Sequence, residues 1–72
     1  ADGPHEVHAV VKGTGTVSVS VSSDVGGLNQ TWTQKVDGWQ ELWLPFALPK
    51  GAGKVTTKVT GASEGRVSVR AL

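Results

Sequence analysis

Apolar and polar residues alternate with a period of two along most of this chain, a pattern typical of β-strands with one buried face. The run 39–49 is the richest in large side chains. One parity of this run forms a core face of Leu42, Leu44, Phe46 and Leu48. The other parity places a carboxylate between two indoles, at Trp39, Glu41 and Trp43. Two indoles are costly to leave in water, so we expect a strand, a loop or a ligand to cover this second face.

The same alternation recurs in further segments that are separated by glycine-rich breaks. Together with the run 39–49, it predicts strands at 6–12, 16–22, 28–36, 54–60 and 66–72. Two short breaks, Gly13-Thr14-Gly15 and Asp37-Gly38, predict hairpin turns that make consecutive strands neighbours. No window shows the spacing of an amphipathic helix. We therefore expect an all-β fold, an antiparallel β-sandwich or partly open barrel of about six strands.

Alternation also assigns a face to each residue of the other strands. The inward sets are Val7, Ala9 and Val11; Val17, Val19 and Val21; Leu28, Trp32 and Val36; Val55, Thr57 and Val59; and Val67, Val69 and Ala71. Most outward positions hold serine, threonine, lysine or arginine. Trp32 is therefore interpreted as a core or edge-covering residue, in contrast to the other two tryptophans.

Length and composition limit the stability of such a chain. Its 72 residues make one domain, 1–72, and a domain of this size buries only about 60% of the surface that its unfolded chain exposes. The sequence has no cysteine, so no disulfide supplements the core. We expect homo-oligomerisation or contact with a larger parent chain to supply further burial. Whether the chain is a minimal domain, a fragment or a module of a larger protein stays open.

Charge and hydropathy argue against two classes of partner. Seven basic and six acidic residues leave a net charge of +1, which is too small for a strong field toward nucleic acid or an anionic membrane. No apolar run approaches the ~20 residues that a membrane-spanning helix needs. We therefore expect neither a nucleic-acid partner nor a membrane partner.

The reactive residue types do not fall into a catalytic or metal-binding pattern. His5 and His8 project to opposite faces of a strand, whereas the zinc motif of metalloproteases needs two histidines four apart on a helix. We interpret them as two solvated histidines near a terminus. The serines form the regular outer face of a strand, without a nucleophile elbow. The sequence therefore predicts no enzyme activity, no metal site and no cofactor.

The second half of the chain carries an ordered series of motifs. Gly38-Trp39-Gln40 is followed by an alternating strand, by the turn Leu48-Pro49-Lys50-Gly51 and by the closing strand Gly65-Arg66-Val67-Ser68-Val69. From about residue 31 to the end, this order resembles the C-terminal half of galactose-binding-like jelly-roll carbohydrate-binding modules. The resemblance implies a jelly-roll-like sandwich that binds sugar without catalysis. The N-terminal half of such modules supplies a structural calcium site and has no counterpart here, so calcium is not carried over.

The tryptophan-bearing parity of the run 39–49 is the candidate site. An indole stacks on the apolar face of a sugar ring, while neighbouring charged groups hydrogen-bond the sugar hydroxyls. The predicted ligand-binding residues are Trp43, Trp39, Glu41, Lys58 and Arg70. Trp43 is the expected stacking platform, and Trp39, which follows a turn, is the one expected to pack under a loop or a subunit.

Two functions from different classes stay open. The first is carbohydrate binding by a lectin-like module of a secreted polysaccharide-acting protein, although the absence of cysteine fits a bacterial secreted domain and a reducing compartment equally well. The second is a self-associating structural β-domain whose tryptophan patch is a subunit interface.

Overall fold

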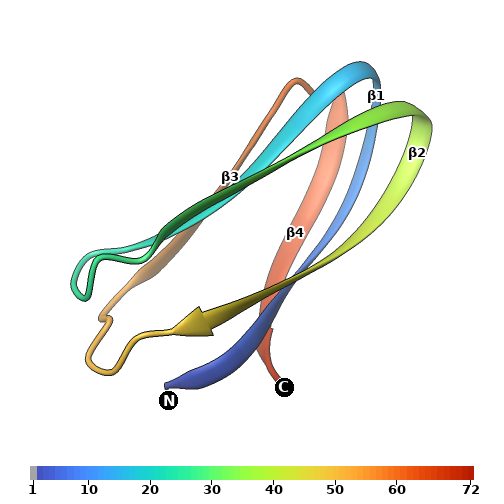
Figure 1. Cartoon of the computed structure of the whole chain (residues 1–72). Helices are drawn as coiled ribbons and strands as arrows, with labels where there is room; N and C mark the ends of the chain where they lie inside the picture. Colours follow the sequence, from blue (N-terminus) through green and yellow to red (C-terminus); the bar gives the residue numbers. More distant parts are fainter. Residues whose placement is uncertain (1) are drawn as a thin grey trace.

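In the computed structural model, which describes residues 2–72, the chain forms four strands and no helix. The strands are β1 (Gly3–Ser23), β2 (Asn29–Leu48), β3 (Val55–Thr60) and β4 (Glu64–Ala71). The other three strands all pair antiparallel with β1, which is the centre of the sheet. β2 lies along one edge of β1, and β4 and β3 share the other edge (Figure 1). The predicted all-β antiparallel class is confirmed.

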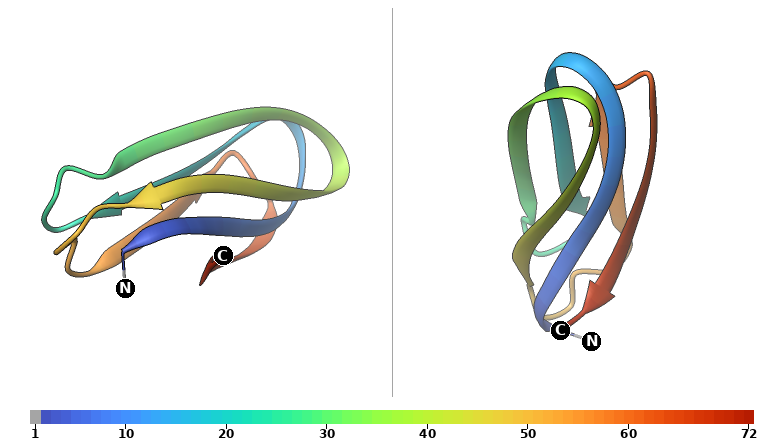
Figure 2. Two further views of the ribbon diagram at one scale, coloured as in Figure 1. Left: turned by 60° about the horizontal axis from the view of Figure 1, so that its bottom comes forward. Right: turned by 90° about the vertical axis from the view of Figure 1, so that its right-hand side faces the viewer.

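The long hairpin of β1 and β2 is folded over near its middle, so that the sheet has two halves (Figure 2). In the first half, residues 5–12 of β1 lie between β4 and the second part of β2. In the second half, residues 18–23 of β1 lie between β3 and the first part of β2. The segments 28–36 and 39–49, predicted to be antiparallel neighbours, instead contribute the two parts of one strand.

The two predicted hairpin turns are bends within continuous strands. Gly13 pairs with Gly38 and Thr14 pairs with Asp37, so both strands bend at the same level. Gly15 and Gly38 have φ angles of 116° and 91°, which residues with a side chain rarely adopt. A two-residue type I′ turn needs positive φ at both central residues, and within the described chain only glycines have positive φ. The prediction of about six strands is therefore wrong, and four longer strands replace them.

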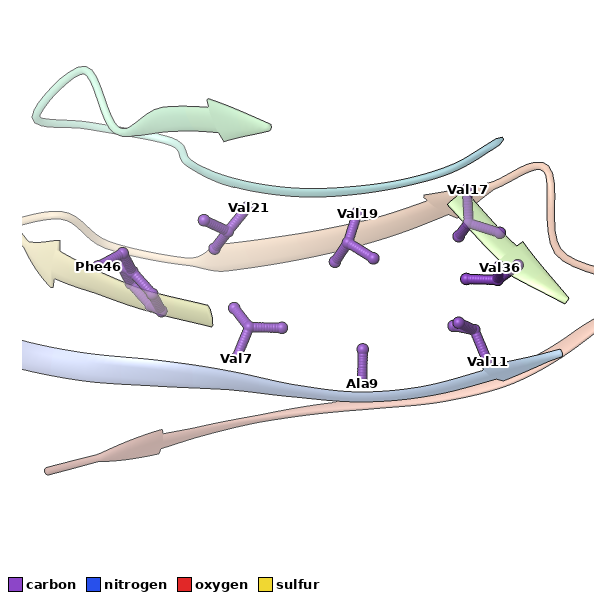
Figure 3. Close-up of a cluster of buried hydrophobic side chains, with 8 residues drawn as sticks. All are labelled: Val7, Ala9, Val11, Val17, Val19, Val21, Val36 and Phe46. Carbon is purple, nitrogen blue, oxygen red and sulfur yellow. The ribbon is translucent and has the colours of Figure 1, made fainter. Parts of the chain in front are cut away.

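The hydrophobic core lies between the two halves of the sheet (Figure 3). Its side chains come from both halves of β1 and from β2, and each is at most 6% exposed: Val7, Ala9, Val11, Val17, Val19, Val21, Val36 and Phe46. Partly buried residues surround this cluster, among them Trp32 and Leu44. The inward faces predicted for β1 and β2, including the core or edge-covering role of Trp32, are confirmed.

Two predicted environments are wrong. Val69 and Ala71 lie on the predicted inward face, beside Val7 and His5, but they are not buried: Val69 is 37% exposed and Ala71 is exposed, because β4 is an edge strand that pairs only with β1. His5, predicted to be solvated, is buried. It shares the inward parity of Val7, its ring lies 5.7 Å from that of Phe46, and its Nδ1 lies 2.9 Å from the Gly3 carbonyl oxygen.

Candidate functional site

The outer surface of the first half of the sheet carries two tryptophans. Residues paired across neighbouring strands lie side by side on one face, so the register fixes four rows across β2, β1 and β4. The rows are Pro45–Glu6–Arg70, Trp43–His8–Ser68, Glu41–Val10–Arg66 and Trp39–Lys12–Glu64. We call these residues the tryptophan face. Trp39 is 58% exposed and Trp43 is 48% exposed, so the outward parity predicted for both is correct.

Trp43 is held by contacts within the tryptophan face. The His8 ring stacks on the indole with centroids 3.8 Å apart and an interplanar angle of 9°. Because a carboxylate can only accept, Nε2 of His8 donates to Glu41 Oε2 at 2.7 Å. The Arg70 guanidinium lies 5.4 Å from the indole centroid and also contacts Glu6 at 3.1 Å. Trp43 is therefore a fixed side chain that already stacks on protein.

Trp39 has fewer contacts and a more open surface. Nζ of Lys12 lies 5.9 Å from the indole centroid and 3.8 Å from a Glu64 carboxylate oxygen. Beside the indole is a shallow hollow whose lining is Val10, Trp39, Glu64, Gly65 and Arg66. Trp43, the expected stacking platform, already has the His8 ring and the Arg70 guanidinium against its indole, whereas Trp39, expected to be covered, is the more exposed of the two and lies beside open space.

A second hollow adjoins the first across the middle of the face. It is lined by His8, Val10, Arg66, Val67 and Ser68, so it shares Val10 and Arg66 with the hollow beside Trp39. Val10 is an apolar residue at an outward position of β1, and its small side chain leaves a low point between the aromatic residues of β2 and the charged residues of β4. The two hollows follow one another along β1 and β4, and Arg66 lines both of them.

The structure brings four of the five predicted site residues together. Trp39, Glu41, Trp43 and Arg70 all belong to the tryptophan face. Lys58 does not: it pairs with Ser20 on the second half of β1, and the two halves of the sheet pack inner face to inner face. The outer surface that holds Lys58 therefore points away from the tryptophans, and its inclusion in the site is wrong.

Several residues of this face are absent from the predicted site. His8, Val10 and Lys12 share the outward parity of β1, and Glu64 and Arg66 share that of β4. Parity in the segments 6–12 and 66–72 gives the face of most of them, but it does not show that β1 lies between β2 and β4. Glu64 falls in a predicted turn, whereas it begins β4.

The side chains of the tryptophan face suit non-covalent binding. Among residues 2–72, no three histidine, aspartate or glutamate side chains gather so as to hold a metal ion. The face offers instead exposed indoles, three carboxylates that accept hydrogen bonds, and guanidinium and ammonium groups that donate them. This combination is chemically suited to a ligand that has both an apolar surface and many hydroxyl or charged groups.

Comparison of the chain with protein-family models, with curated proteins and with solved structures found no match. The resemblance to jelly-roll carbohydrate-binding modules therefore stays a prediction. In the part of the chain that the structure describes, no helix has the length and apolar character needed to cross a membrane. The described chain is a small all-β protein with an exposed aromatic face.

Proposed function

We propose that this chain binds carbohydrate, without catalysis, through the tryptophan face. The observation that carries the proposal is the surroundings of Trp39. Its indole is 58% exposed and borders a hollow that is also lined by Glu64 and Arg66. A sugar ring that stacks on the indole would bring its hydroxyls next to groups that accept and donate hydrogen bonds.

The two tryptophans would contact different parts of one ligand. They are four residues apart on one strand, which corresponds to about 13 Å at 3.3 Å per residue. This separation exceeds one sugar ring, so the ligand is an oligosaccharide or polysaccharide rather than a free monosaccharide. Trp39 provides the open indole face, and Trp43, fixed by His8 and Arg70, provides a rigid second contact.

The same proposal includes the sandwich architecture and the kind of protein in which the chain acts. The two halves of the sheet enclose one core, as the two sheets of a β-sandwich do, so we regard the fold as a reduced jelly-roll-like sandwich. We further propose that the chain acts as a module of a secreted polysaccharide-acting protein. An open, shallow face suits reversible attachment to a polymer, with a dissociation constant between millimolar and micromolar, or about 4 to 8 kcal/mol.

The decisive experiment is calorimetric titration of the protein and of Trp39→Ala with a panel of soluble oligosaccharides. We expect Trp39→Ala to weaken binding about tenfold, because it removes one stacked aromatic contact of about 1–2 kcal/mol. Its melting temperature should stay close to that of the unchanged protein, since the indole has few protein contacts. Ser20→Ala, on the outer surface of the second half, is the matched control and should bind every ligand normally. Absence of binding to the whole panel would contradict the proposal.

Self-association through the tryptophan face is the second candidate function. The observation that favours it is the exposure of two large apolar side chains, Trp39 and Trp43, on one face of a very small domain. If this candidate is correct, the melting temperature rises with protein concentration, and Trp39→Ala yields a monomer in sedimentation. A monomer mass at every concentration, with a constant melting temperature, would rule it out.

A further inference from the structure

The charged residues of the tryptophan face are arranged in pairs with one exception. All three carboxylates lie beside a basic side chain of a neighbouring strand, in the pairs Glu6–Arg70 (3.1 Å), Glu41–His8 (2.7 Å) and Glu64–Lys12 (3.8 Å). Arg66 is the exception: within residues 2–72 it takes part in no ion pair and no side-chain hydrogen bond. Its guanidinium is the basic group of this face that has no acidic partner.

The register explains why Arg66 has no partner. In its own row, Arg66 lies next to the apolar Val10. The carboxylate at the far end of that row, Glu41, is turned toward His8 of the adjacent row. The nearest carboxylate along β4 is Glu64, two residues away, and it faces Lys12. Each acidic group within reach is therefore engaged elsewhere.

Arg66 is also placed where a ligand would lie. It lines both hollows of the face, and it shares the larger hollow with the open indole of Trp39. A sugar stacked on Trp39 and extending over Val10 would pass directly beside the guanidinium. A planar guanidinium matches a carboxylate with two parallel hydrogen bonds, whereas a single hydroxyl can use only part of it.

From this arrangement we infer that the sugar chain bound here is acidic, with uronate residues whose carboxylate pairs with Arg66. This inference rests on the proposed carbohydrate function and adds the class of ligand. The attraction is a short-range contact, because each carboxylate of the face already contacts a side chain of a neighbouring strand and the whole chain has a net charge of only +1. Binding should therefore depend weakly on salt, as one partly exposed charge pair does.

The test compares uronate oligosaccharides with their own neutral forms. Oligogalacturonate, oligomannuronate and oligoglucuronate are each titrated by calorimetry against the same chains after chemical reduction of every carboxyl group to an alcohol. The reduction removes the charge and keeps the ring and the linkage. We expect at least one acidic chain to bind about tenfold more tightly than its reduced form, the size of one charge-assisted hydrogen-bonded contact.

Two variants that each remove one positive charge test whether Arg66 causes the preference for the acidic form. Arg66→Gln is expected to lose the preference for the acidic form and to bind the acidic and reduced forms with equal affinity, because its amide can donate a hydrogen bond to a hydroxyl but carries no charge. Lys58→Gln removes the same charge from the opposite outer surface and should leave the preference unchanged. Arg66 is exposed, so Arg66→Gln should melt at the same temperature as the unchanged protein. A preference that survives in Arg66→Gln would overturn the inference.

The remaining outcomes distinguish the uronate assignment from the proposed carbohydrate binding on which it rests. Equal binding of acidic and reduced chains would overturn the uronate assignment and leave carbohydrate binding intact. Binding of neither form, nor of any neutral oligosaccharide, would overturn both. A single-stranded oligonucleotide is the anionic control. Tighter binding of that oligonucleotide, with the steep salt dependence of several phosphate contacts, would also overturn the inference.

Discussion

Gly61→Ala is expected to lower the free energy of unfolding by about 2–5 kcal/mol. Gly61 has a φ of 85, and a Cβ atom built on it would lie 2.4 Å from the Thr16 carbonyl oxygen. The unusual φ alone costs a residue with a side chain about 1–2 kcal/mol, and the collision requires movement of two backbone segments, which adds about 1–3 kcal/mol. Urea denaturation followed by far-ultraviolet circular dichroism measures the loss.

The size of this effect matters because the domain is small. At about 0.05–0.15 kcal/mol per residue, a chain of 72 residues has roughly 4–11 kcal/mol of stability in total. Gly51→Ala is the matched control: Gly51 has a φ of 73, but nothing lies within 4 Å of the position that a Cβ atom would occupy there, so only the cost of φ applies. Equal losses in the two variants would show that β1 and the turn after β3 do not approach closely at Gly61.

Gly61 is sensitive because of its position at the bend. It lies between β3 and β4 and packs on Thr16, immediately after the bend of β1. The Gly61 carbonyl oxygen is also 3.3 Å from the position that a Cβ on Gly13 would occupy. Glycines from the strand bend and from the turn thus pack backbone against backbone. This contact closes the folded end of the sheet, where side chains would otherwise keep the segments apart.

The faces of the strands could be predicted from the sequence better than their partners. Alternation has a period of two, so it states which side chains share a face and nothing about which strand lies alongside. The predicted inward valines of β1 and outward tryptophans of β2 are therefore correct. The predicted pairing is not, because Gly13-Thr14-Gly15 and Asp37-Gly38 each have the composition of a hairpin turn when considered alone. Only their alignment across β1 and β2 identifies them as one shared bend.

The errors in the candidate site also arise because alternation does not identify neighbouring strands. Trp39, Glu41 and Trp43 lie on one strand, so parity alone groups them. Assigning Lys58 to the same surface assumes that β3 lies beside the tryptophan-bearing part of β2, whereas β3 pairs with the other half of β1. Arg66 is not among the predicted site residues. The role that we infer for it depends on cross-strand pairs that engage the neighbouring carboxylates, and these pairs follow from the register.

Val19→Ala is expected to lower the free energy of unfolding by about 2–3 kcal/mol, because it removes two methyl groups from a side chain that is 1% exposed. Val19 points across the core toward Ala9 of the other half of the sheet (Figure 3). Ala9 cannot extend into the space that the substitution leaves, and Trp32 and Val59 flank Val19 on strands held by their own pairing. The cavity should therefore persist.

The reciprocal substitution tests whether the two halves pack against each other at this point. Ala9→Val alone should overfill the core and cost about 1–3 kcal/mol. In the double variant Val19→Ala with Ala9→Val, the added methyl groups enter the space vacated by Val19. We therefore expect the double variant to lose at least about 1 kcal/mol less than the sum of the single losses, as residues in direct contact do. Strictly additive losses in urea denaturation would mean that Ala9 and Val19 do not share a space. The two halves of the folded sheet would then not pack face to face, which is the packing that places the tryptophan face on the outside.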